Sequence, residues 1–150
     1  MFFTYLIISE ATMKNDFKPK GYPTLIPYMA VQDADKSIEF YKRTYGFEMG
    51  SDPVMENGKV QHAEMKLGDC FIMFAPEGAF DSPARSAAST NNVQGINLYI
   101  YVPDVDKHYQ QCKDTGGKIT MPLDNMFWGD RMYQTQCLNG YMWSFATKAA

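Results

Sequence analysis

The stretch Gly95-Ile-Asn-Leu-Tyr-Ile-Tyr-Val-Pro-Asp-Val-Asp-Lys107 predicts a buried strand that leads directly into a capped helix. Successive side chains of a strand point to opposite faces, which separates this stretch into two sets. The aliphatic set consists of Ile96, Leu98, Ile100 and Val102. The other set is polar and aromatic and consists of Asn97, Tyr99 and Tyr101. We expect the aliphatic set to face the core and the other set to face a ligand or water. Asp104 offers an oxygen that can cap the helix.

The chain contains this pattern twice, because Thr24-Leu-Ile-Pro-Tyr-Met-Ala-Val-Gln-Asp-Ala-Asp-Lys36 lies 71 residues earlier. The identical pairs in the two copies are Tyr28/Tyr99, Val31/Val102, Asp33/Asp104, Asp35/Asp106 and Lys36/Lys107. The same offset continues without a gap to Phe74/Phe145 and Ala75/Ala146. An internal repeat of only two copies predicts one pseudo-symmetric unit rather than a solenoid.

Both copies predict the element order β-α-β-β-β. In the first copy we expect strands at 24–31, 47–50, 60–67 and 70–75 and a helix at 34–45, with an Asn57-Gly58 hairpin turn. In the second we expect strands at 95–102, 118–121, 131–137 and 141–147 and a helix at 105–115. This order predicts an α+β fold in which tandem βαβββ modules form a curved mixed sheet around a cavity, with the helices outside. The expected divisions are an N-terminal extension at 1–21 and a single domain at 22–150, with modules 22–76 and 95–148 joined by a linker at 77–94.

Composition narrows the class of protein. The 150 residues suit one domain, and a net charge of −3 argues against a nucleic-acid partner, which would need a basic face. Three cysteines without CxxC spacing fit a reducing compartment. No stretch is long enough to span a membrane. The opening Met1–Ser9 resembles the short apolar region of a signal peptide, but no Lys or Arg precedes it and it lacks a convincing cleavage site. We therefore expect an extra edge strand or an artefact of start-codon choice there, and a cytoplasmic protein without a membrane partner.

Several local segments resemble one protein family. Ser37-Ile-Glu-Phe-Tyr-Lys-Arg-Thr-Tyr-Gly-Phe47, together with the two modules, resembles the vicinal oxygen chelate superfamily of glyoxalase I, extradiol dioxygenases, and bleomycin- and fosfomycin-resistance proteins. Segments 61–69, 127–131 and 139–147 resemble its PhnB-like branch. The resemblance covers residues 22–148 and implies the paired-module fold. It also implies a homodimer, for which exposed sheet edges would be suited.

The resemblance implies a divalent metal held by four side chains, two from each module. At these positions this chain has Ile26, Met73, Asn97 and Ser144. A hard divalent ion needs imidazole nitrogens and carboxylate oxygens, which this set lacks. We therefore expect no cofactor, and a divalent metal only at a displaced site. The branch also closes on Asp-Pro-x-Gly-His, where this chain has Cys137-Leu-Asn-Gly-Tyr141.

His62 and Glu64 lie two apart on a strand and therefore share a face. If that face lines a cavity, they are the candidates for acid–base catalysis; otherwise they belong to a solvated outer face. The repeat offset assigns Arg131, Tyr133 and Thr135 to the corresponding face of the second module. The predicted ligand-binding residues are Tyr28, Phe71, Tyr99, Tyr101, Trp128, Arg131 and Tyr133. For Trp128 and Arg131, a role in binding an anionic ligand and a role in fixing the loop both stay open.

Two functional hypotheses follow. The first is metal-independent binding of a small aromatic or anionic molecule in an aromatic-lined cavity. The alternative is a lyase, isomerase or dioxygenase that uses a displaced metal or His62 as acid or base. A protein-interaction role is a third, weaker class. The sequence names neither the ligand nor the geometry of the dimer.

Overall fold

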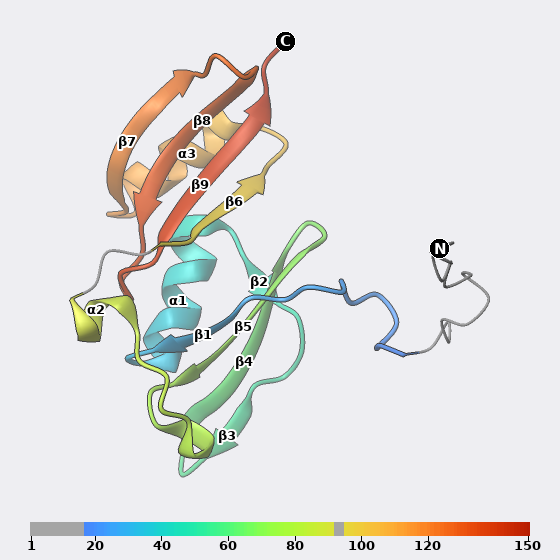
Figure 1. The fold of residues 1–150 in the computed structure, drawn as a ribbon, viewed down its shortest axis with the longest axis vertical. Helices are drawn as coiled ribbons and strands as arrows, with labels where there is room; N and C mark the ends of the chain where they lie inside the picture. Colours follow the sequence, from blue (N-terminus) through green and yellow to red (C-terminus); the bar gives the residue numbers. More distant parts are fainter. Residues whose placement is uncertain (1–16, 92–94) are drawn as a thin grey trace, which may run out of the picture.

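The computed structural model describes residues 17–91 and 95–150, so the strand considered at Met1–Ser9 lies outside the described residues (Figure 1). In Figure 1 the first module occupies the lower half of the molecule and the second module the upper half, with helix α1 at their junction. Each module has the predicted β-α-β-β-β order, with one additional short strand in the first. The α+β prediction is therefore confirmed.

The first module forms one mixed sheet. Its elements are β1 (Tyr28–Val31), α1 (Ala34–Tyr45), β2 (Glu48–Met49), β3 (Val54–Glu56), β4 (Lys59–Leu67) and β5 (Cys70–Pro76). The strand order is β1-β5-β4-β2, with β3 also paired to β4. Strand β1 runs parallel to β5, whereas the other pairs are antiparallel.

The second module repeats this plan. Its elements are β6 (Asn97–Tyr101), α3 (Val105–Asp114), β7 (Lys118–Asn125), β8 (Asp130–Gln136) and β9 (Met142–Lys148). The strand order is β6-β9-β8-β7, and β6 is parallel to β9. Within the described residues the strands form two separate sheets and no closed barrel, so the expected curved sheet is divided at the boundary of the repeat.

Both long helices begin where the sequence predicts; α1 also ends at the predicted residue, and α3 ends at Asp114, one residue before the predicted end. The Asp33 carboxylate accepts a hydrogen bond from the Lys36 N–H at 3.0 Å, and Asp104 accepts one from Lys107 at 3.1 Å. Helix α1 ends at Gly46, whose φ of 78° is in the left-handed region that glycine adopts without a steric penalty. No helix among the described residues is both long and apolar enough to cross a membrane.

The two modules share one aromatic core. The rings of Tyr41 and Tyr45 in α1 each lie 5.5 Å from the Trp143 ring in β9, centroid to centroid. The Phe145 ring lies 5.0 Å from that of Tyr45. Because helix α1 of the first module thus packs on a strand of the second, the core covers the helix side of both sheets and leaves their opposite faces without a helix.

Three strand boundaries differ from prediction by two residues or more. The first strand begins at Tyr28 rather than Thr24; Pro27 accepts a hydrogen bond from Met73 through its carbonyl but has no N–H to donate. Ile96 precedes β6 and is 70% exposed, so it does not join the aliphatic core set. Strand β7 continues to Asn125, with two shifts in its register against β8.

The linker is more ordered than its composition indicates. It contains the short helices η2 (Ala79–Asp81) and α2 (Ala87–Thr90). Its polar residues fold back on Glu77, which accepts hydrogen bonds from the Ser86 N–H at 2.8 Å and the Arg85 Nε at 3.1 Å. Hydrogen bonding from Ser89 and from the Ser86 backbone lowers the pKa of Glu77 to about 2. Glu77 therefore stays ionised and fixes the first half of the linker.

Candidate functional site

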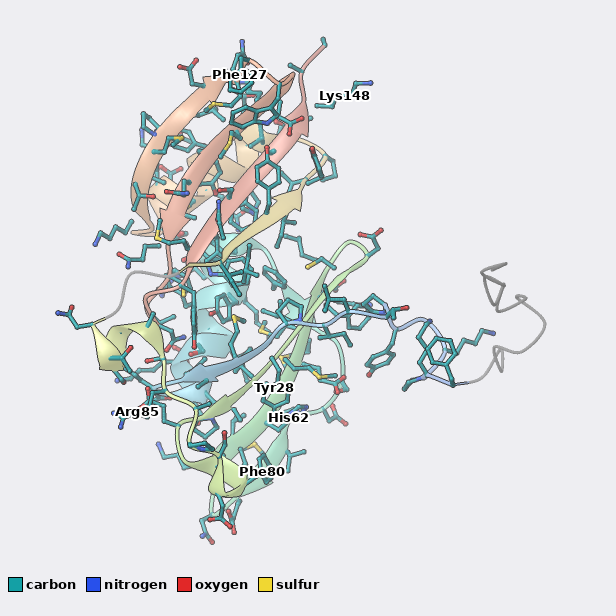
Figure 2. The ribbon with its side chains drawn as sticks, viewed as in Figure 1. Tyr28, His62, Phe80, Arg85, Phe127 and Lys148 are labelled. Atoms are coloured by element: carbon teal, nitrogen blue, oxygen red, sulfur yellow. The ribbon has the colours of Figure 1, made fainter. Side chains whose placement is uncertain are left out.

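A chain of hydrogen-bonding side chains crosses the face of the first sheet that lies away from the helices. The Tyr28 hydroxyl is 2.9 Å from His62 Nδ1, and His62 Nε2 is 3.5 Å from Glu64 Oε1. The Tyr22 hydroxyl donates to Glu64 Oε2 at 2.6 Å. We call these four residues the polar chain. Figure 2 shows Tyr28 and His62 close together in the lower module, with Phe80 below them.

The strand order explains why these residues meet. Strand β5 lies between β1 and β4, and Met73 of β5 is paired with both Tyr28 and Glu64. Residues directly opposite one another in a sheet point to the same face, and His62 shares that face because it lies two positions from Glu64. The sequence predicted that His62 and Glu64 share a face; their association with Tyr28 depends on the pairing of distant strands.

The electrostatics of the polar chain favour a neutral phenol beside a carboxylate. Hydrogen bonds from Tyr22 and, more weakly, Ser51 lower the pKa of Glu64, which therefore stays ionised. Partial burial raises the pKa of Tyr28, so its hydroxyl stays protonated. A protonated Tyr28 and an ionised Glu64 are both satisfied by the His62 tautomer in which Tyr28 donates to Nδ1 and the Nε2–H points to Glu64. The Tyr28 oxygen then remains able to accept a hydrogen bond from a ligand.

An apolar pocket of about 260 Å³ adjoins the polar chain at Tyr28. Ala30 and Ala75, which are paired across β1 and β5, contribute to its lining. Phe80 of η2 forms another wall, is 68% exposed, and has a φ of 55°. A non-glycine residue in the left-handed region is strained, and such strain is frequent at ligand-binding sites. No pattern in the sequence indicated Phe80, which lies in the linker, or Tyr22, which is the first residue of the predicted domain.

A second cluster lies on the corresponding face of the second sheet. The hydroxyls of Tyr99 and Tyr101 donate to Asp130 Oδ2 at 2.6 and 2.7 Å, and the Trp128 Nε1 donates to the same oxygen at 3.2 Å. The two phenols lower the pKa of Asp130. The structure thus brings together three predicted ligand-binding residues around the Asp130 carboxylate.

The predicted aromatic residues do not enclose one cavity within the chain. Tyr28 lies on the first sheet, whereas Tyr99 and Tyr101 lie on the second, and Phe71 packs on Tyr22 with ring centroids 5.0 Å apart. In Figure 2, Phe127 at the top of the molecule is far from Tyr28 and His62. Within the described residues, Tyr28 and the pair Tyr99 and Tyr101 therefore do not line the same pocket.

Arg131 and Tyr133 lie on the opposite face from the one we predicted. Arg131 Nη2 lies 2.9 Å from Asp106 Oδ1 in α3, and the buried Tyr133 hydroxyl lies 2.7 Å from His108 Nδ1. Both side chains therefore point to the helix and not to a cavity. For Arg131, the loop-fixing alternative is the one that the geometry supports.

The cause of this error is a change in the repeat offset. Glu64 is paired with Met73, whereas Gln134 is paired with Ser144, so the offset is 70 residues on this strand and 71 on the next. Between these equivalent paired positions, the chain therefore contains one more residue around the turn before β9 than around the turn before β5. A one-residue slip moves every side chain of a strand to its other face. Tyr133 therefore corresponds to Ala63 rather than to His62, and Gln134 corresponds to Glu64.

The positions that hold a metal in the superfamily do not fit a hard divalent ion here. Asn97 Nδ2 donates to Ser144 Oγ at 2.8 Å, so the two polar members bind each other. Met73 and Ile26 offer no hard oxygen or nitrogen donor from their side chains. Across residues 17–91 and 95–150, no three His, Cys, Asp or Glu side chains are grouped as metal ligands.

With this fold, the chain belongs to the Glyoxalase/Bleomycin resistance protein/Dioxygenase superfamily, whose family model matches residues 24–145. An uncharacterised protein of Mycobacterium bovis is 27% identical over 124 residues, which is 81% of each chain. A counterpart in Mycobacterium tuberculosis (strain H37Rv) has the same identity over 81% of this chain and 72% of its own.

Solved structures share the fold. TioX from Micromonospora sp. ML1 has a TM-score of 0.69 at 23% identity, covering 83% of this chain and 97% of TioX. The bleomycin resistance determinant encoded on the transposon Tn5 has a TM-score of 0.61 at 17% identity, covering 85% and 99%.

Proposed function

We propose that this protein binds a small aromatic molecule on the open face of the first sheet, without a metal. The observation that carries this proposal is the polar chain of Tyr28, His62, Glu64 and Tyr22 beside the apolar pocket of about 260 Å³. Ligand sites combine apolar walls with a few convergent polar groups, and this arrangement has both. The ring of the ligand would lie against Ala30, Ala75 and Phe80, and its polar group would meet Tyr28 and His62.

An anionic ligand would depend on His62. Arg131, which we had considered as the partner of an anion, is engaged by Asp106 through two guanidinium nitrogens, at 2.9 and 3.0 Å. The imidazolium form of His62 is then the positive group in contact with Tyr28 at the pocket. We therefore propose that an anionic group of the ligand would contact His62 beside Tyr28.

We also propose a homodimer. The second sheet exposes an aromatic surface above Asp130, in which Phe127 is 97% and Trp128 51% exposed. Contiguous apolar surface of this kind is typical of interaction sites. A second copy that covers it would bring the Asp130 cluster to the pocket of the first sheet, which would join the two groups that one chain keeps apart. Segments 61–69, 127–131 and 139–147 support placement of the chain in the PhnB-like branch.

The alternative function is a lyase, isomerase or dioxygenase that uses His62 as acid or base or a displaced metal. The phenol–imidazole–carboxylate order of the polar chain is the observation that favours it. However, acid–base catalysis is most effective with a pKa near the working pH, and burial moves the pKa of Tyr28 upward, away from it. A structural neighbour that is named for bleomycin resistance shares this fold, which is compatible with a binding role.

The proposal is tested with 2-naphthoate, a planar aromatic anion, by isothermal titration calorimetry on protein treated with EDTA. Ala75→Leu should abolish binding because the larger side chain fills the pocket. Tyr28→Phe should weaken binding roughly 2- to 10-fold, because the ligand loses one neutral hydrogen bond. Tyr109→Phe, on helix α3, is the matched control and should leave binding unchanged. Equal affinities of Ala75→Leu and the parent protein would contradict the proposed site.

A further inference from the structure

The indole of Trp143 in β9 is completely buried, yet its Nε1–H meets no hydrogen-bond acceptor among residues 17–91 and 95–150. It is the one fully buried side-chain nitrogen or oxygen in these residues of which this is true. Buried donors in folded proteins are nearly always paired, because an unpaired donor has lost its water without compensation. The Trp143 Nε1–H therefore lacks the hydrogen-bond acceptor that a buried donor normally has.

Trp143 also lines a cavity of about 100 Å³ at the boundary between the two sheets, which we call the seam cavity. Its walls include Pro27 and Ile72 from the first module and Leu98 and Ile100 from β6. The edge strands β1 and β6 exchange no ladder hydrogen bonds here, because they belong to different sheets. The seam cavity is thus formed by apolar side chains from both modules.

A second cavity, of about 230 Å³, adjoins the seam cavity. It shares Pro27 and Leu98 with the seam cavity and extends to Ile96, which is 70% exposed. An apolar protein cavity of about 150 Å³ can hold benzene. The two adjoining spaces are therefore large enough for a substituted benzene that enters past Ile96.

Water is a poor occupant for the seam cavity. A buried water makes about three hydrogen bonds, and the polar groups at the cavity are already engaged. The Tyr99 hydroxyl donates to Asp130 at 2.6 Å, and the Pro27 carbonyl accepts from the Met73 N–H at 2.9 Å. The Cys70 thiol is only a weak donor. Trp143 lines this apolar cavity and carries a strong unpaired donor, a combination that suits an apolar molecule with one acceptor.

We propose that the seam cavity binds an uncharged, mainly apolar small molecule whose single acceptor, such as a ketone oxygen, accepts a hydrogen bond from Trp143 Nε1. No charged side chain lines the cavity, so a charged ligand would be desolvated without a partner. His62, Glu64 and Phe80 do not line it either. The seam cavity shares no lining residue with the pocket of the proposed function, whereas the neighbouring cavity shares Tyr28 and Met29 with that pocket. The proposal does not depend on the proposed function.

The test uses NMR of the indole N–H groups with two probes of similar shape, acetophenone and ethylbenzene. The chain has two tryptophans, so a Trp128→Phe variant assigns the resonance of Trp143. Acetophenone should move the Trp143 N–H resonance downfield in a saturable manner. Ethylbenzene, which lacks the acceptor, should bind about tenfold more weakly and produce no downfield shift, since tenfold corresponds to one good hydrogen bond.

Two variants complete the test. Trp143→Phe should remove the preference for acetophenone over ethylbenzene, as measured by thermal shift. If that variant does not fold, Leu98→Phe, which fills the seam, should abolish the acetophenone effect while Trp143 is retained. His62→Ala should leave the effect unchanged, which separates this site from the proposed function. A Trp143 resonance that acetophenone does not move, or equal binding of the two probes to the wild-type protein, would overturn the proposal.

Discussion

Asn139 and Ser37 are 102 positions apart in the chain, yet the Asn139 Nδ2 donates a hydrogen bond to Ser37 Oγ at 3.0 Å. The Asn139 Oδ1 accepts from the Gln32 N–H, also at 3.0 Å. Asn139 lies in the turn before β9, whereas Gln32 and Ser37 lie at the start of α1. This buried side chain therefore ties the second module to the first.

Asn139→Ala should lower the free energy of unfolding by about 1–3 kcal/mol, because the Gln32 N–H and the Ser37 hydroxyl lose their partner. Urea denaturation monitored by circular dichroism measures this change. Asn125→Ala is the control, since Asn125 is exposed and only accepts a long hydrogen bond from Arg131 at 3.3 Å. The control should change stability by less than about 0.5 kcal/mol. Equal losses in the two variants would show that Asn139 does not join the modules.

His108 should make the stability dependent on pH. Burial removes the His108 ring from water and lowers its pKa below the ordinary value of 6.5, although the hydrogen bond of 2.7 Å to the Tyr45 carbonyl acts in the opposite direction. The unfolded chain therefore binds this proton more readily than the folded chain. The contribution of His108 is complete above its unfolded pKa and is lost as the pH falls through its lower folded pKa.

Melting temperatures between about pH 5 and 7 test this expectation. His108→Gln keeps one donor and one acceptor and should flatten the pH dependence. The chain has two histidines, so His62→Gln is the matched control and should retain the dependence of the wild-type protein. If the His108→Gln and wild-type curves are parallel, the buried histidine does not set this dependence.

Arg131→Ala should not weaken the binding of 2-naphthoate. The Arg131 guanidinium binds Asp106 in α3, and an exposed ion pair contributes little to stability. Calorimetry should therefore give an unchanged affinity and thermal melting a nearly unchanged midpoint. A selective loss of affinity for anions, with folding intact, would show that Arg131 contacts the ligand. Its side chain would then lie on the open face of the sheet and not on the helix side.

Metal analysis tests the absence of a metal cofactor. Protein purified without a tag and dialysed should contain no stoichiometric Zn, Ni, Fe or Mn, because Met73 and Ile26 cannot replace imidazole or carboxylate ligands. Atomic emission spectroscopy makes this measurement. One equivalent of metal that disappears in His62→Ala or Glu64→Ala would instead establish a displaced site and favour the enzyme alternative.

The repeat predicted most of the fold because both copies carry the same strong local signals. Asp33 and Asp104 cap the helices, and Asn57-Gly58 forms the hairpin turn, with φ values of 51° and 74°. These features are local and need no knowledge of the rest of the chain. The division into two sheets is not local, since it depends on whether the edge strands β1 and β6 pair with each other.

The candidate site was predictable only in part. His62 and Glu64 share the predicted face because strand parity is a local property. Tyr22 meets Glu64 because segments that are distant in the sequence lie together in the fold. No pattern within a single sequence predicts that contact. Tyr133 was assigned to the wrong face because the gap-free offset hid one extra residue in the turn before β9. A repeat therefore predicts side-chain faces only as far as the turn lengths agree.

The most direct test of metal-independent binding at the first sheet is an ¹⁵N–¹H NMR titration of EDTA-treated protein with 2-naphthoate. We predict saturable shifts confined to the residues around the pocket and the polar chain, chiefly Ala30, His62, Ala75 and Phe80, without added metal. Shifts that require a divalent metal, or that centre on the helices instead of this face, would contradict the account.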